Sequence, residues 1–312
     1  MTEEKKTKID LAEKHYRQKK YREAIVLCEE IHKEYPEDES ALLILSWAYY
    51  DSGEVGQAEK YLHILLEREL KRRVFTGFAF DELVRIYNQQ KDFQKLTEIC
   101  GRAVAAQPED VGLLTELGNA YLKSGKPEKA CAIYEKLVEA ENDNPVYYCY
   151  WGEALFAAGR SKESEEAYRQ AGEIDSGQAD RYYFKIAVLF QQAGNYKEAE
   201  RLLNKCIAAD SSNPLYYCSL GDNLVSLGQI RKALQAYEKA VQCDHSRAGA
   251  YYNRLGHSLM KIGNFAQAVE AFEAAINYEP VGPYYLSLAA AYKEMGLMEK
   301  AESIIRGLGK IK

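Results

Sequence analysis

One pattern in the sequence returns at a fixed distance along the chain. Residues 117–121 read Leu-Gly-Asn-Ala-Tyr, and Gly125, Ala130 and Tyr134 follow. The same spacing recurs around later glycines, namely Gly152, Gly221 and Gly256. Gly152 lies 34 residues after Gly118, and each stretch reads as two helices joined by a turn. Repetition at this distance is typical of stacked helical hairpins, so the sequence predicts an all-α solenoid of helix-turn-helix units.

The repeat resembles the tetratricopeptide repeat family. That family has Leu-Gly at positions 7 and 8 of each copy, small residues at 8 and 20, and an aromatic residue at 24. Aligned copies place these residues at position 8: Ala12, Ser46, Val84, Gly118, Gly152, Ala187, Gly221, Gly256 and Ala289. The resemblance runs from about Lys5 to the C-terminus. It implies a right-handed superhelical solenoid of about nine hairpins, a single domain over residues 5–312 after a frayed tail at residues 1–4.

The third copy is irregular between residues 66 and 96. Val84 lies 38 residues after the preceding anchor, so about four residues are inserted. Val84 and Leu96 stand where the motif has small residues, and Lys91 replaces a turn glycine. Bulky residues there should push the two helices apart or rotate them. Two interpretations stay open: a local change in superhelical pitch, or drift that one repeat tolerates.

Composition excludes several classes of function. The net charge is −6, whereas binding to a nucleic-acid backbone needs a basic face. The first six residues include four charged ones, Glu3 to Lys6, and lack the apolar core of a secretory signal. No run approaches the roughly 18 apolar residues of a membrane span. Seven cysteines without a C-x-x-C pair favour reduced thiols, and hence a cytoplasmic location. We therefore expect neither nucleic-acid binding nor membrane insertion.

No constellation of residues indicates catalysis. The sequence has no glycine-rich phosphate loop and no H-E-x-x-H pair. Its five histidines are scattered without the spacing of metal ligands. The Gly256-His257-Ser258 stretch lacks the second glycine of a nucleophile elbow. The sequence thus predicts no enzyme, no cofactor and no metal site.

The candidate binding residues lie on one face of each first helix. The helical period turns positions 2, 5, 9, 12 and 13 away from the hairpin core. In the family this face lines a concave groove that holds peptides. The residues singled out are Tyr16, Trp47, Tyr50, Arg85, Asn119, Glu153, Phe156, Arg181, Phe184, Lys185, Asp222 and His257. The resemblance therefore implies a scaffold that binds a polypeptide segment of another protein, whose identity the sequence does not give.

The aromatic members of this set are unusual for a monomer surface. Exposed apolar patches tend to mark interaction sites, and aromatic residues dominate binding hot spots. Trp47 and Tyr50 lie three residues apart and share a face. With Tyr16 of the neighbouring copy they could form one platform, and Arg85 could pair with an acidic residue of the ligand. For Phe156 and Phe184, half-burial between adjacent first helices is an equally good interpretation.

Two further interpretations concern partners. Some family members read a C-terminal carboxylate through a clamp of Lys, Asn and Arg residues, and the best match here is Asn119, Arg181 and Lys185. Thr115 replaces the clamp lysine and Glu153 replaces the middle asparagine, which would repel a carboxylate. The ninth copy lacks a polar capping helix. Ile304, Leu308 and Ile311 could therefore mediate homo-oligomer formation through the C-terminal hairpin.

Overall fold

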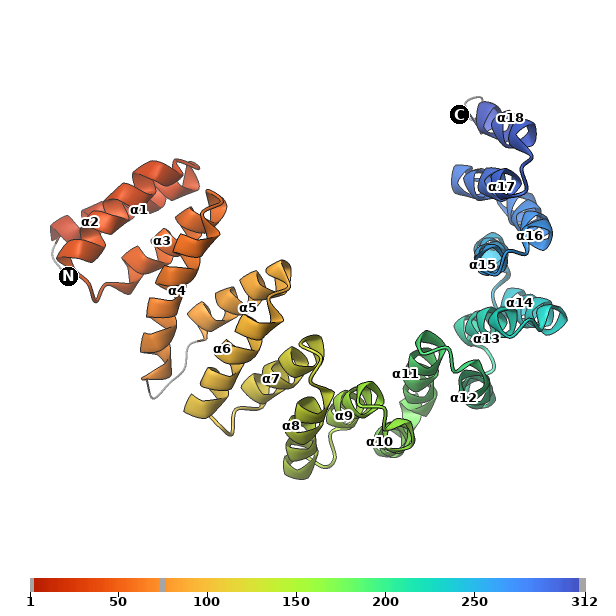
Figure 1. The fold of residues 1–312 in the computed structure, drawn as a ribbon, viewed down its shortest axis with the longest axis horizontal. Helices are drawn as coiled ribbons and strands as arrows, with labels where there is room; N and C mark the ends of the chain where they lie inside the picture. Colours follow the sequence, from red (N-terminus) through yellow and green to blue (C-terminus); the bar gives the residue numbers. More distant parts are fainter. Residues whose placement is uncertain (1–2, 73–76, 309–312) are drawn as a thin grey trace. The chain divides into compact units, whose positions relative to one another are not determined.

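The computed structural model describes residues 3–72 and 77–308, and within these ranges the chain forms eighteen α-helices and no strand (Figure 1). The helices are α1 Glu3–Arg17, α2 Tyr21–Glu34, α3 Glu39–Asp51, α4 Val55–Leu70, α5 Phe78–Gln90, α6 Phe93–Ala106, α7 Val111–Lys123, α8 Pro127–Ala140, α9 Pro145–Ala157, α10 Ser161–Ile174, α11 Ala179–Gln192, α12 Tyr196–Ala209, α13 Pro214–Ser226, α14 Ile230–Cys243, α15 Ala248–Lys261, α16 Phe265–Tyr278, α17 Gly282–Glu294 and α18 Met298–Leu308. Single 3₁₀ turns, Ser176–Gln178 and His245–Arg247, precede α11 and α15. Consecutive helices pair as nine hairpins, so the predicted all-α repeat architecture is confirmed.

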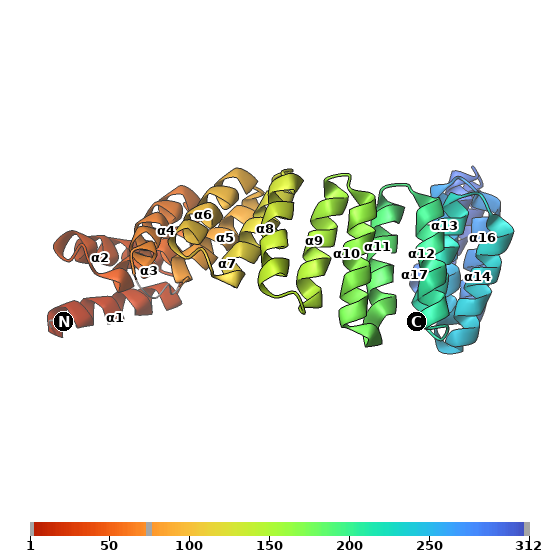
Figure 2. The same ribbon diagram turned by 90° about the horizontal axis from the view of Figure 1, so that it is seen from below.

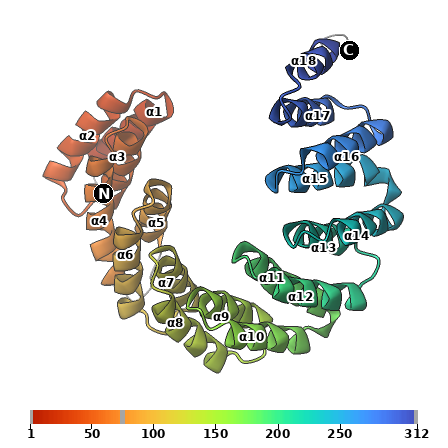
Figure 3. The same cartoon turned by 45° about the vertical axis from the view of Figure 1, so that its right-hand side comes forward.

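Packing divides the chain into two compact units, residues 1–137 and 138–312, with the boundary inside α8. Successive hairpins lie side by side within each unit (Figure 2). The first helix of one hairpin contacts the first helix of the next, as α1 contacts α3 and α13 contacts α15. Figure 3 shows the odd-numbered helices of each unit as one layer and the even-numbered helices as the other. The interpretation of residues 5–312 as a single domain stays a prediction.

Helix ends follow local sequence signals. The side chains of Asp38 and Asp110 accept hydrogen bonds from backbone N–H groups three residues ahead, which caps α3 and α7. Asn144 and Asn213 cap α9 and α13 in a similar way, each followed by proline at the first helical position. These side chains satisfy N–H groups that have no partner inside the helix. The start of each hairpin is therefore specified locally.

The turns inside the hairpins need one residue in the left-handed region. Glycine fills this place, as predicted, at Gly125, Gly159, Gly194, Gly228 and Gly263, with φ between 70° and 79°. The first and third hairpins instead place Lys19 and Lys91 there, at φ 60° and 57°. A residue with a Cβ atom is less stable in this region by about 1 kcal/mol. These two turns therefore close with a lysine in the left-handed conformation rather than by another turn geometry.

A glycine at position 8 lets an aromatic ring from the second helix press against the first helix. A Cβ atom added at Gly118 would lie 2.5 Å from the Tyr134 ring, and one at Gly152 would lie 2.7 Å from Tyr168. Gly221 with Tyr237, and Gly256 with Phe272, show the same close approach. Where position 8 is larger, position 24 is smaller, in the pairs Ala12–Cys28, Ser46–Leu62, Val84–Cys100 and Ala187–Leu203. The residues at positions 8 and 24 are thus complementary in size, as close packing between the two helices of a hairpin requires.

The third hairpin follows this rule. Val84 packs against the buried cluster that contains Cys100, whose side chain is fully buried. Leu96 is buried in the same cluster. Helices α5 and α6 are nevertheless in less extensive contact than the two helices of the first, second or seventh hairpin, and the expected change in superhelical pitch stays a prediction.

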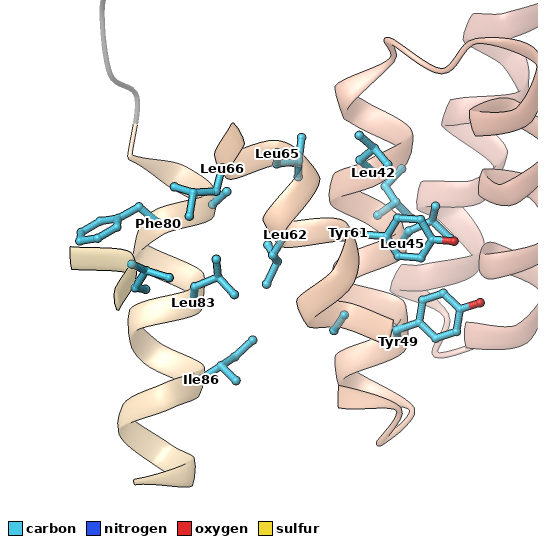
Figure 4. Close-up of a cluster of buried hydrophobic side chains, with 14 of the residues drawn as sticks. Leu42, Leu45, Tyr49, Tyr61, Leu62, Leu65, Leu66, Phe80, Leu83 and Ile86 are labelled. Carbon is cyan, nitrogen blue, oxygen red and sulfur yellow. The ribbon is translucent and has the colours of Figure 1, made fainter. Parts of the chain in front are cut away.

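The N-terminus of α5 is held by a buried carboxylate. Glu69, near the end of α4, is only 5% exposed. Its carboxylate accepts hydrogen bonds from the backbone N–H of Ala79 at 3.0 Å and of Phe80 at 3.4 Å. Figure 4 shows Leu62 and Leu66 of α4 facing Leu83 of α5 in the adjoining apolar core. Glu69 thus supplies the cap that Gly77, without a side chain, cannot give α5.

Two helices are described close to segments outside the described residues. Helix α1 includes Glu3 and Glu4, whose negative charges in its first turn suit the helix dipole, and the predicted frayed tail over residues 1–4 stays a prediction. Helix α4 has 16 residues, more than any other helix in the described part of the chain, and ends at Leu70. Met1, Thr2 and Arg73 lie outside the described residues, as does Ile311 of the expected self-association surface.

Candidate protein-interaction surface

An aromatic ladder crosses the first-helix layer of the N-terminal unit. Tyr16 of α1 stacks on Trp47 of α3, with ring centroids 6.0 Å apart and an interplanar angle of 26°. The ladder continues to Phe78 of α5, whose ring centroid lies 5.7 Å from that of Trp47 with an interplanar angle of 76°. All three side chains are half-buried. Sequence reasoning missed Phe78, although it occupies position 2 on the outward face of its copy.

Tyr50 and Arg85 form a second contact beside this ladder. The Arg85 guanidinium lies 4.5 Å from the centroid of the Tyr50 ring. It also donates to the Glu82 carboxylate, at 2.6 Å from Nη2 and 3.1 Å from Nε. Arg85 therefore already has an anionic partner inside the protein, which weakens the prediction that it pairs with an acidic residue of a ligand.

Polar groups hold the ladder in place. The Tyr16 hydroxyl donates to Asp51 Oδ2 at 2.8 Å. Burial and this hydrogen bond raise the pKa of Tyr16 to about 12, so the hydroxyl stays protonated at neutral pH. The side chain of Tyr50 donates to Gln89 on the next first helix. The predicted residues Tyr16, Trp47 and Tyr50 are thus oriented by contacts between neighbouring hairpins.

In the C-terminal unit the corresponding layer is organised around Asp222. Its carboxylate accepts hydrogen bonds from the hydroxyls of Tyr237 and Ser258. Arg254 of the next first helix pairs with it, with Nη2 at 2.6 Å from Oδ2. Sequence reasoning selected Asp222 but missed Arg254 and Ser258, which lie 32 and 36 residues later on the neighbouring first helix. The Asp222 carboxylate therefore joins two neighbouring hairpins, and its oxygen atoms already accept hydrogen bonds from within the protein.

Two pockets open on this layer. One of about 290 Å³ is lined by eight residues from α11 to α15 and their turns, Gln191, Gln192, Tyr196, Asp222, Ser226, Ser258, Lys261 and Ile262. The other, of about 660 Å³, is lined by His257, Met260, Lys261, Phe265 and Glu294. Burial and the Lys261 charge lower the pKa of His257, which favours a neutral ring at physiological pH. The smaller pocket has a mostly polar lining, whereas Met260 and Phe265 make the lining of the larger one mostly apolar.

The predicted aromatic residues of the C-terminal unit are packed inside it. Phe156 meets Phe190 edge to face, with centroids 5.1 Å apart, and Phe184 lies 5.2 Å from Tyr216. Both are half-buried. These contacts join neighbouring first helices, as the half-burial interpretation described. We assign Phe156 and Phe184 to this packing.

Comparison with known proteins agrees with the repeat pattern. Models of the tetratricopeptide repeat match residues 15–75, 111–144, 180–213, 215–244 and 249–280, which together are more than half of the chain. The chain belongs to the tetratricopeptide repeat family. Proteins built from these repeats are protein-interaction scaffolds, and in general the repeat itself is not catalytic.

Individual relatives are distant. The antiviral innate immune response effector IFIT1 of Macaca fascicularis is 25% identical over 206 residues, which are 63% of this chain and 37% of that protein. The aspartyl/asparaginyl beta-hydroxylase of Homo sapiens is 26% identical over 203 residues, 62% of this chain and 27% of that protein. A crystal structure of a tetratricopeptide repeat protein from Parabacteroides merdae aligns with a TM-score of 0.51 at 18% identity. It covers 84% of this chain and 98% of that one, and supports the fold alone.

The residues of the hypothetical carboxylate clamp are already engaged. Asn119 Oδ1 accepts a hydrogen bond from the Tyr134 hydroxyl at 2.9 Å, within the N-terminal unit. Arg181 Nη1, in the C-terminal unit, donates to Gln178 at 2.7 Å. Lys185 lies near Glu153. Desolvation raises the pKa of the Glu153 carboxyl, and the lysine charge acts in the opposite sense.

The same arrangement occurs twice in this tetratricopeptide repeat protein. A cation at position 6 faces the acid at position 9 of the preceding copy, in Lys185 with Glu153 and in Arg254 with Asp222.

No group of three or more His, Cys, Asp or Glu residues could hold a metal ion within residues 3–72 and 77–308. Over the same part of the chain, no helix has the length and apolar character that crossing a membrane requires.

Proposed function

We propose that this protein is a non-catalytic scaffold that binds a polypeptide segment on the first-helix face of its N-terminal unit. The observation that carries the proposal is the ladder of Tyr16, Trp47 and Phe78, three half-exposed rings contributed by three consecutive hairpins. A segment lying across α1, α3 and α5 would meet all three. Large, rigid side chains lose little conformational entropy on binding and often provide most of the binding energy.

Trp47 is the central anchor of this surface. It contacts both neighbours of the ladder, so its removal affects stability as well as binding. Aromatic pairs contribute about 1 kcal/mol each beyond their buried area, so Trp47→Ala should lower the melting temperature as well as the affinity. Binding must be compared at a temperature where the variant is fully folded.

The experiment begins with a partner captured by the intact protein and identified by mass spectrometry. The affinity of the purified pair is then measured by titration calorimetry. Trp47→Ala should weaken it at least about tenfold, the scale of a truncated hot spot. Val26→Ala serves as the matched control, because Val26 is an exposed apolar residue on the second-helix layer of the same unit. Equal affinity for folded Trp47→Ala and the native protein would disprove the proposed surface.

The alternative is a module that reads a C-terminal carboxylate through Asn119, Arg181 and Lys185. Arg181 supports it, since its guanidinium has a neutral partner, Gln178, rather than an acid. Glu153 beside Lys185 opposes it. A partner peptide with a free C-terminus and its C-terminal amide should bind equally if the first-helix ladder is the site, whereas loss of binding by the amide would favour the clamp.

Two accompanying proposals concern location and assembly. All seven cysteines are free thiols, and burial raises the pKa of Cys28 and Cys100 to about 12; this agrees with a reducing cytoplasm. At the C-terminal hairpin Ile305 is 41% and Leu286 55% exposed, and Ile304 packs on the core beneath. These side chains support the proposal of a homo-oligomer, which light scattering of Ile305→Glu beside the native protein would test.

A further inference from the structure

The aromatic ladder is bordered by carboxylates that the protein leaves without a cation. Asp51 accepts the Tyr16 hydroxyl but pairs with no lysine or arginine in the described part of the chain. Asp81 follows Phe78 by one helical turn on α5, so the two side chains share a face. Its carboxylate is exposed and makes no hydrogen bond or ion pair within residues 3–72 and 77–308.

The arginines of this layer do not neutralise Asp51 or Asp81. Arg17 pairs with Glu13 on α1 at 2.5 Å, and Arg85 pairs with Glu82 on α5. Partial desolvation raises the pKa of the Asp81 carboxyl, and the nearby charges of Glu69 and Glu82 act in the same direction. An uncompensated negative charge beside half-exposed rings attracts a cation.

The protein itself contains an example of this kind of contact. Arg85 stacks over Tyr50 at 4.5 Å while its guanidinium bonds to Glu82, a carboxylate on the same helix. The neighbouring set of Trp47, Phe78 and Asp81 offers the same chemistry, a ring and a carboxylate, without the cation. A guanidinium suits such a place because its plane can stack on a ring while its edge donates to a carboxylate.

We propose that the segment bound at the first-helix face carries an arginine or lysine that lies against the Trp47–Phe78 rings and pairs with Asp81. This inference rests on the proposed function and names the chemistry of its partner: a basic peptide segment with apolar flanks, not an acidic one. Asp51, which accepts the hydrogen bond of Tyr16 at one end of the ladder, adds to the attraction. Binding of such a segment should weaken as salt rises, since the pair lies near the surface.

The probe is a phage-displayed library of random dodecapeptides, selected on the immobilised full-length protein. Clones retained by the native protein and lost by Trp47→Ala should share a basic residue. Synthetic peptides from these clones should bind Asp81→Asn about fivefold more weakly than the native protein, the scale of a partly desolvated cation–ring contact with an ion pair. Asp81→Lys should select acidic clones instead.

Glu30→Lys is the matched charge control, because Glu30 is an exposed acid on the second-helix layer of the same unit. It should leave the selected sequences unchanged. Clones that depend on Trp47 but lack a basic residue, or bind Asp81→Asn as well as the native protein, would overturn this inference and leave the proposed function standing. If no clone depends on Trp47, both fail.

Discussion

The third and seventh hairpins fill the space between their two helices with residues of opposite size at positions 8 and 24. In the seventh, Gly221 makes room for the Tyr237 ring, and glycine closes the turn at Gly228. In the third, Val84 occupies the glycine's place opposite the small Cys100, and Lys91 closes the turn at φ 57°. A tetratricopeptide hairpin therefore does not require a small residue at one fixed position. A larger residue at position 8 is instead matched by a smaller residue at position 24, so that the two side chains together fill the space between the helices.

The two hairpins also differ in how their first helices are held. Asp222 of the seventh hairpin receives Arg254 from the next first helix and Tyr237 from its own partner helix. Arg85 holds the same repeat position in the third hairpin, and its contacts are Glu82 on its own helix and Tyr50 on the preceding one. The third hairpin depends instead on Glu69, which reaches its N-terminus from α4. The seventh hairpin is thus linked to the next by an ion pair between repeat positions 9 and 6. The irregular third hairpin instead has its first helix capped by the buried Glu69 carboxylate.

The largest expected effect is at Glu69. Glu69→Ala would leave buried N–H groups of α5 without their acceptor, and we expect a loss of about 3 kcal/mol in the free energy of unfolding. Urea denaturation followed by circular dichroism measures it. Glu67→Ala is the control on the same helix, where an exposed pair with Arg102 should contribute at most about 1 kcal/mol. Similar losses in the two variants would mean that Glu69 does not hold the third hairpin.

Overpacking of the seventh hairpin comes next. Gly221→Ala should destabilise by about 2 kcal/mol, because the new methyl group meets the Tyr237 ring. Adding Tyr237→Leu should recover part of this loss, since the sixth hairpin pairs Ala187 with Leu203. Gly101→Ala, with open space around its Cβ, should stabilise by about 0.5 kcal/mol. Strictly additive effects in the double variant would refute size complementarity.

A smaller difference is expected at position 9. Asp222→Asn keeps the shape but leaves Arg254 without its anion, and a loss of about 1.5 kcal/mol in the free energy of unfolding follows. Arg85→Gln removes a surface ion pair within one helix and a contact with the Tyr50 ring, and should change the free energy of unfolding by under about 1 kcal/mol. Calorimetric unfolding of both variants tests the contrast. The reverse order would show that the third hairpin, not the seventh, depends on this position.

The smallest effect concerns the turns. Lys91→Gly should stabilise by about 0.5 kcal/mol, because relief of the left-handed strain exceeds the added flexibility of the unfolded chain. Gly228→Ala should destabilise by about 1 kcal/mol for the same reason. Chemical denaturation resolves both shifts. Destabilisation by Lys91→Gly would mean that the lysine side chain makes a contact worth more than the strain.

The sequence by itself determined the repeat, the helices and the turns. A period of about 34 residues with glycine at most of the turns is a local signal, because every hairpin is specified by its own residues and by those of its neighbour. For the same reason Trp47 and Asp222 could be assigned to the first helices of their hairpins, whereas a binding role for them stays a prediction. Phe78 and the pairing of Val84 with Cys100 could also have been found, by applying the repeat positions to every copy.

Only the tertiary structure decided which of those outward side chains are already in use. Asp222 and Arg254 are far apart in sequence, and their ion pair arises from the register between two first helices. The same holds for Glu69 and the start of α5, on either side of an insertion that no repeat position describes. Helical periodicity gives the direction of a side chain from its own helix. Its contacts depend on the neighbouring helix, whose distance and rotation are fixed by the packed core between them.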